Sequence, residues 1–195
     1  MTTDTAPPEA AHDEWHQSTA FQPRANRIGL WLFIFSEVFL FSAFLAARFY
    51  TTGTDRPDDL NQNLALAVTI VLLISSVSAY LAETAIRFNK RRGFIIGLSV
   101  TLAMGLLFMV GVSIELYEAT LHYPPETAYG SSYFMLIGLH AFHVITGMFA
   151  LLIVFVLGIR GYFGSTNYWG VEGAVKYWHF VDLAWVFIYP TLYLL

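Results

Sequence analysis

The chain has 195 residues, of which 56% are hydrophobic and only 12% are charged. Such a balance is typical of proteins whose solvent is the lipid bilayer rather than water. Fourteen acidic residues outnumber ten basic ones, and the net charge of −4 excludes a basic nucleic-acid-binding surface. Because the sequence contains no cysteine, disulfides, thiolate metal ligands and thiol catalysis are excluded as well.

The N-terminal segment is polar and acidic, and it carries Pro7 and Pro8. It lacks the basic start and the apolar stretch of a signal peptide. We expect Met1–Pro23 to be solvated and flexible, because such a polar stretch cannot bury enough apolar surface to fold alone. Residues 1–27 are therefore assigned to a cytoplasmic N-terminal tail.

Five apolar stretches follow, and each is long enough to cross a membrane. A helix needs about 20 apolar residues to span a hydrocarbon core of about 30 Å. The connections between the stretches are short and rich in polar residues, Gly or Pro, so no separate soluble domain fits between them. We predict an all-α membrane protein in which residues 28–195 form a bundle of five transmembrane helices, at about 28–50, 64–86, 94–117, 133–157 and 175–195.

Small and aromatic residues indicate how these spans pack. Small residues let helix backbones approach closely in lipid, and we expect this of Gly138, Gly147 and a set in the second and third spans: Ser75, Ser76, Ser78, Ala79, Gly97, Gly105 and Gly111. Aromatic residues gather at the predicted span ends, where the headgroup region favours amphipathic rings; they include Trp31, Tyr50, Tyr133, Trp169, Tyr177 and Trp178. We prefer this interpretation to a quinone or haem pocket.

The basic residues predict the orientation of the bundle. With five spans, the N-terminal tail and the second and fourth connections lie on one side, and they hold Arg24, Arg27, Arg87, Lys90, Arg91, Arg92, Arg160 and Lys176. The opposite side holds only Arg48 and Arg56. Because cytoplasmic segments carry the excess of Lys and Arg, we predict a cytoplasmic N-terminus and an external C-terminus.

Ionisable side chains inside the predicted spans need an explanation, because they are costly in lipid unless they are paired or neutral. The candidate buried polar residues, with a proton-handling or structural role, are Glu37, Glu115, Glu118, His140, His143, His179 and Asp182. At 1.5 Å per residue, Glu37 overlaps in depth with His140 and His143. A buried contact between this carboxylate and a histidine is therefore feasible.

Three of the spans carry polar residues at i and i+3, which would face one way on a helix and could suit a carboxylate-bridged metal site. The pairs differ in predicted depth, however, since Glu115 and Glu118 lie near the outside and His179 and Asp182 near the inside. We therefore predict no metal, haem or catalytic residue in this chain. Physical reasoning alone leaves a transporter, a proton-handling subunit and an assembly partner open.

Four stretches resemble the cytochrome c oxidase subunit III family in register. They are GLWLFIFSEVFLF at 29–41, ELYEA at 115–119, YGSSYF and GLHAFHVITG between 129 and 147, and YWHFVDLAW at 177–185. The resemblance covers nearly everything after Arg27. It implies that Glu37 is the family's intramembrane carboxylate, that His140 and His143 are its paired fourth-span histidines, and that His179 and Asp182 are the polar pair of its last span.

The resemblance also implies a function, partners and a location. Subunit III of such a proton-pumping terminal oxidase carries no redox centre; haem and copper belong to partner subunits. It packs against subunit I, in a complex that also contains subunit II, holds phospholipid and supports proton uptake in aerobic respiratory electron transport. The five-span form resembles the shorter bacterial version, which lacks the first two of seven spans, and implies a bacterial plasma membrane.

The chain departs from the family pattern at two connections. Thr127-Ala128 replaces the usual Asp-Gly before Tyr129, and Asn167-Tyr168 replaces a His-His pair. Alternatives that stay open are subunit III of a quinol oxidase, the accessory subunit of a nitric oxide reductase, a stand-alone membrane metal enzyme and a small proton-coupled transporter. The transporter is disfavoured because the sequence has no inverted repeat.

Overall fold

A computed structural model describes residues 9–54, 62–122 and 124–194, with residues 9–24 as backbone alone. Over these residues the chain forms five helices, which confirms the all-α class. They are α1 (Glu9–Thr52), α2 (Gln62–Arg87), α3 (Arg91–His122), α4 (Ala128–Ile159) and α5 (Trp169–Tyr193). Four segments of the described chain are long and apolar enough to cross a membrane: Ala25–Thr52 of α1 and the whole of α2, α3 and α4.

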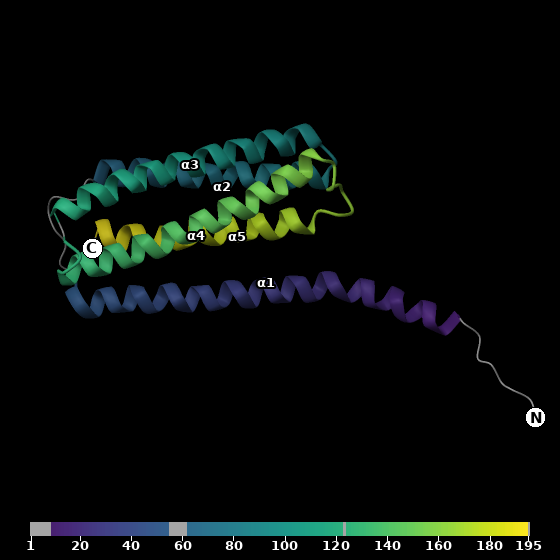
Figure 1. Cartoon of the computed structure of the whole chain (residues 1–195), viewed down its shortest axis with the longest axis horizontal. Helices are drawn as coiled ribbons and strands as arrows, with labels where there is room; N and C mark the ends of the chain where they lie inside the picture. The colour runs from purple at the N-terminus through teal and green to yellow at the C-terminus, as the bar shows by residue number, and fades with distance from the viewer. Residues whose placement is uncertain (1–8, 55–61, 123, 195) are drawn as a thin grey trace, which may run out of the picture.

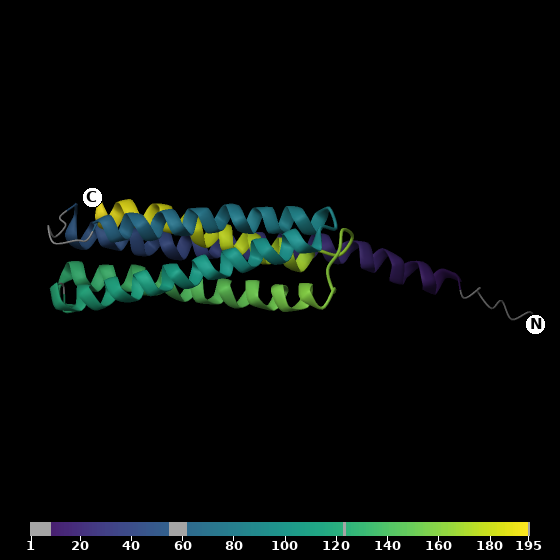
Figure 2. The ribbon, with the colours of Figure 1, turned by 90° about the horizontal axis from the view of Figure 1, so that it is seen from above.

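Helices α2 to α5 form a four-helix bundle against which α1 is laid (Figures 1 and 2). Within this bundle α5 contacts α2 and α4, and α3 contacts the same two helices from the other side. Helix α1 packs on α4 and α5, and over the described residues it makes no contact with α2 or α3. Helix α5 consequently lies between α1 and α2.

The N-terminal region differs from the expectation. Helix α1 begins at Glu9, and Figure 1 shows its first turns extending beyond the end of the bundle. The expectation of a flexible tail up to Pro23 is therefore wrong from Glu9 onward, where the backbone is helical. Ala, Glu and Gln between residues 9 and 22 are good helix formers, which favours a helix there although Pro23 removes one backbone hydrogen bond between this stretch and the apolar span. Residues 1–8 lie outside the described residues.

Close contacts at small residues hold α2 against α3, as predicted. A Cβ on Gly97 would lie 2.8 Å from the Cβ of Ala82, and one on Gly111 would meet Val68. The two glycines of α4 that were expected to pack closely have different surroundings. A Cβ on Gly147 would lie 3.0 Å from Trp178, but one on Gly138 would meet nothing within 4 Å. The packing prediction is thus wrong for Gly138, which is on an exposed face of α4.

Two aromatic residues expected at the headgroup level are instead fully buried in the bundle, namely Trp178 and Tyr133. Their polar atoms have protein partners, which removes the need for an aqueous interface. The Trp178 indole N–H donates to Ser75 Oγ on α2 at 3.1 Å. About two turns further along α5, the Trp185 indole N–H donates to Thr69 Oγ1 at 2.8 Å. These bonds tie α5 to α2.

Candidate functional site

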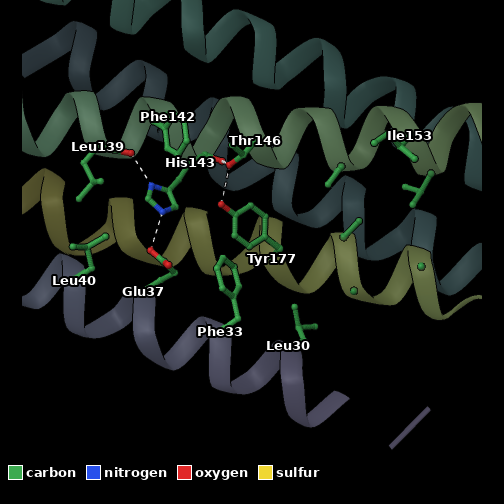
Figure 3. A pocket seen from close by; sticks show the side chains of 15 residues that line it. Leu30, Phe33, Glu37, Leu40, Leu139, Phe142, His143, Thr146, Ile153 and Tyr177 are labelled. Atoms are coloured by element: carbon green, nitrogen blue, oxygen red, sulfur yellow. Dashed lines mark hydrogen bonds and ion pairs between the residues drawn. The ribbon is translucent and has the colours of Figure 1, made fainter. Parts of the chain in front are cut away.

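The central feature is an acid–histidine pair between α1 and α4 (Figure 3). His143 Nε2 lies 3.0 Å from Glu37 Oε2, and the two side chains are only 6% and 16% exposed. This confirms the predicted contact between Glu37 and a fourth-span histidine. At 1.5 Å per residue, Glu37 lies about 18 Å along α1 from Ala25, which places the pair near the middle of the apolar segment.

The hydrogen bonds of His143 determine how many protons the pair holds. His143 Nδ1 lies 2.8 Å from the carbonyl oxygen of Leu139, and a carbonyl can only accept, so Nδ1 carries a hydrogen. The contact between Nε2 and Glu37 then needs one further proton, which is on either the ring or the carboxyl group. In both cases the pair is neutral overall. A neutral pair is the form that a bilayer interior tolerates.

The pair opens onto a cavity of about 730 Å³ between α1, α4 and α5. Its walls are mostly apolar, with Phe33 and Phe142 among them. Beside the pair, Thr146 Oγ1 and the Tyr177 hydroxyl lie 2.9 Å apart (Figure 3). The cavity therefore combines apolar walls with one cluster of hydrogen-bonding groups, an arrangement suited to amphipathic molecules in a membrane. Thr146 and Tyr177 were not predicted as site residues.

His140 is near His143 in sequence but has a different environment. Its ring is fully buried and packs against Trp185, with ring centres 4.8 Å apart, and edge-on against Phe108. Neither ring nitrogen has a hydrogen-bond partner among the described residues. The spacing of three residues therefore does not make a histidine pair: one ring faces the bundle core and the other faces Glu37.

His179 and Asp182 lie on the opposite side of α5, toward α2. His179 Nδ1 is 2.6 Å from Ser76 Oγ. Asp182 is only 3% exposed, and its carboxylate lies beside the same hydroxyl without meeting hydrogen-bond geometry. Ser76 was predicted as a packing residue; its contact with His179 adds it to the polar cluster.

The two glutamates of α3 that were predicted as buried polar residues also have different environments. Glu115 is buried near the end of the bundle where α5 ends, beside the hydroxyls of Tyr133 and Tyr193, whose oxygens are 3.1 Å apart. Glu118 is exposed on α3. A buried cation at the same end was missed by sequence reasoning: Arg48 is 1% exposed and lies over the ring of Tyr129 at 5.0 Å. Its position next to polar Thr51 and Thr52 made it look like an exposed end residue.

At the other end of the bundle, Glu172 links α1 to α5. Its carboxylate accepts from Arg27 at 3.1 Å and from Lys176 at 2.5 Å. Burial alone would raise the pKa of Glu172, but the hydrogen bonds from Lys176 and Arg27 outweigh it and lower this pKa below its ordinary value. Glu172 lies outside the predicted spans, and its acidic character alone gave no signal of this role.

The polar residues thus form separate small clusters. In the part of the chain that the structure describes, no three His, Asp or Glu side chains come together in a way that could hold a metal ion. Two of the three i, i+3 pairs point their members to different places, and the third pair, His179 and Asp182, shares only the hydroxyl of Ser76. The interpretation of these spacings as shared metal ligands is not supported by the geometry.

Comparison with known proteins identifies the family. The family model described as cytochrome c oxidase subunit III matches residues 9–195. The chain belongs to this family. It is 34% identical over 187 residues to cytochrome c oxidase subunit 3 of Equus caballus, covering 90% of this chain and 71% of that protein. It is 36% identical over 179 residues to that of Cyanidium caldarium, covering 86% and 66%.

All seven candidate buried polar residues lie within the matched region. The structure adds what the family match does not give, namely which of them interact. Glu37 joins His143, and His179 joins Ser76, while His140 is packed among aromatic rings. The subunit III family places such a chain in a multi-subunit membrane oxidase.

Proposed function

We propose that this protein is the non-catalytic subunit III of a proton-pumping haem-copper terminal oxidase. The observation that carries the proposal is the family match over residues 9–195 together with the neutral Glu37–His143 pair at mid-membrane depth. The protein stabilises subunit I and supports proton uptake, in a complex that also contains subunit II. Haem and copper are held by those partner subunits, and phospholipid covers the apolar exterior of this chain.

The proposed topology has five spans, with α5 as the fifth. Helix α5 carries Glu172, Lys176, His179 and Asp182, and it is not among the described segments that length and apolar composition alone mark as able to cross a membrane. It can still cross the bilayer because most of its polar atoms have partners within the bundle and not in lipid. With eight of the ten basic residues on one side, the N-terminus is cytoplasmic and the C-terminus external. The proposed location is a bacterial plasma membrane.

Copurification tests the proposal directly. The tagged chain, extracted in mild detergent, is expected to bring down subunits that contain haem and copper in stoichiometric amounts. An oxidase prepared without this chain should retain its haem spectrum, but its turnover should decline sooner and its proton uptake should be slower. Recovery with a nitric oxide reductase instead, or metal bound tightly to the isolated chain, would contradict the proposal. Assays with reduced cytochrome c and with a quinol identify the electron donor.

A further inference from the structure

A second groove, between α1 and α5, lies on the other side of α1 from the acid–histidine cavity. It has a volume of about 400 Å³ and is bounded by Trp31, Phe35 and Val38 of α1 and by His179 and Leu183 of α5. We call it the α1–α5 groove. Helix α1 makes no contact with α2 over the described residues, and α5 lies between them. We call the α1–α5 groove, together with the exposed surfaces of α5 and α2 beside it, the slot, and we refer to α5, its middle helix, as the floor of the slot.

The floor of this slot is polar, although the depth is that of the bilayer core. His179 lies about 15 Å along α5 from Trp169 and about 21 Å from Tyr193, at 1.5 Å per residue. Lipid headgroups do not reach this level, and acyl chains offer no hydrogen bonds. The Ser76–His179 contact at 2.6 Å and the nearly buried carboxylate of Asp182 are therefore out of place on a surface that faces only lipid.

The positions of the protons on His179, Ser76 and Asp182 determine which hydrogen bonds this cluster can make to a neighbouring molecule. Ser76 lies between His179 Nδ1 and Asp182, and a net charge at this depth is costly. If His179 is protonated and Asp182 ionised, both ring nitrogens carry hydrogens. If Asp182 is protonated, it can donate to Ser76, which donates to Nδ1, so the hydrogen of the neutral ring is on Nε2. In these two states Nε2 is a donor, whereas it is an acceptor when Nδ1–H donates to Ser76 and Ser76 donates to protonated Asp182. In every state the ring that carries Nε2 lines the groove.

The walls of the slot favour a helix over a flat ring or an acyl chain as its occupant. Leu183 and Phe187 continue the exposed surface of α5 toward its C-terminus, and both are more than half exposed. On α2, Leu73 and Tyr80 flank Ser76 at helical spacing and are 43% and 57% exposed. Lys176 also lines the groove, three residues before His179, but its ammonium group is bonded to Glu172. A largely apolar groove between two helices, with His179 halfway along, matches a transmembrane helix that carries a single polar side chain.

We propose that the slot floored by α5 is the docking site for a transmembrane helix of a partner oxidase subunit, which presents a hydrogen-bond acceptor to His179 Nε2 at mid-membrane depth. This inference rests on the proposed function, since it names the surface through which the chain joins the oxidase. The acceptor is a carboxylate, amide, hydroxyl or backbone carbonyl oxygen. Bonding to it would satisfy the one donor that the cluster leaves facing outward.

Photo-crosslinking in the intact complex tests the site. A benzophenone amino acid replaces Leu183 or Phe35 in the slot, and Phe149 on the exposed face of α4 serves as a control of similar exposure. We expect the two slot positions to form adducts with one identified oxidase subunit, in at least fivefold higher yield than position 149. Adducts with lipid or an isoprenoid quinone alone, or equal protein yields at all three positions, would overturn the inference.

A matched pair of variants tests the hydrogen bond. His179→Leu removes the donor, whereas His179→Gln keeps an N–H donor at similar reach. We expect His179→Leu to lower the amount of chain retained in the purified oxidase by about threefold to tenfold, and His179→Gln to lower it much less. Equal retention of both, with both folded by protease resistance, would contradict the inference. If the wild-type chain failed to copurify with any oxidase, the proposed function itself would be wrong.

Discussion

The strongest quantitative prediction concerns the Glu37–His143 pair, and it is made with a double-mutant cycle. His143→Leu replaces the imidazole with an apolar side chain of similar volume and leaves the Glu37 carboxyl group without its partner. Glu37→Leu does the reverse, and the double variant removes both polar groups. Glu37→Gln is the control, because its amide N–H can still donate to His143 Nε2 while Nδ1 continues to donate to Leu139.

The size of the effect follows from burial. Both side chains are largely shielded, at 6% and 16% exposed, so the remaining group cannot be solvated by bulk water. Leaving a buried polar group without a partner costs about 1–3 kcal/mol. The free energy of unfolding should fall by about that amount in each single leucine variant. In the double variant the loss should be smaller than the sum of the two, with a coupling of about 1–3 kcal/mol, because no orphaned group remains.

Thermal unfolding of the purified complex in mild detergent, followed by release of this chain, measures these differences. Glu37→Gln is expected to unfold close to wild type. Additive losses in the double leucine variant would show that the two groups do not stabilise each other. A Glu37→Gln variant as unstable as His143→Leu would refute the conclusion that the pair is neutral and shares one proton, since that conclusion is what makes glutamine a faithful substitute.

Three further outcomes are expected. Gly147→Leu should loosen α4 from Trp178 and lower the retention of the chain in the complex, whereas Gly138→Leu should be tolerated, and equal loss in both would contradict the packing. The pKa of Glu172 is lowered in the folded chain, so its ion pairs contribute their full stability above the ordinary carboxyl pKa of 4.5. This stability is lost as the pH falls through the lower pKa of the folded state. The unfolding curves of wild type and Glu172→Gln should therefore converge at low pH. A C-terminal alkaline phosphatase fusion should be active outside the cytoplasm, and neutralising the basic connection between α2 and α3 should weaken that preference.

Sequence reasoning located the helices and the depth of the polar groups, because both follow from the position of residues along a helix. The overlap in depth of Glu37 with the fourth-span histidines made a contact feasible, and the structure contains one, with His143. Rotation about the helix axis could not be obtained in the same way. In a soluble bundle the apolar stripe marks the inward face, but in lipid the outward face is apolar too. Only the structure shows that His143, and not His140, is the partner of Glu37 and that Gly138 faces outward.

The same limitation explains the buried residues that were missed. Arg48 and Tyr133 lie near the ends of apolar stretches, where a charge or a phenol ring is normally at the headgroup level. Their burial depends on partners from other helices: Arg48 lies over Tyr129 of α4, and the Tyr133 hydroxyl meets that of Tyr193 on α5. Only the tertiary arrangement brings these groups together, so no local pattern in the sequence indicates them.

Helix α5 shows why hydropathy alone is an incomplete guide to a membrane bundle. It carries several ionisable residues, yet it occupies the place between α1, α2 and α4, where its indoles bond to α2 and its Glu172 bonds to α1. A helix surrounded by other helices does not need to be apolar all round, because its neighbours take the place of lipid. The polar residues of α5 then become directional contacts that fix its rotation, which close packing between apolar helices specifies less strongly. The ring of His179 lines an open groove about halfway along α5, and that is the physical reason for expecting a partner there.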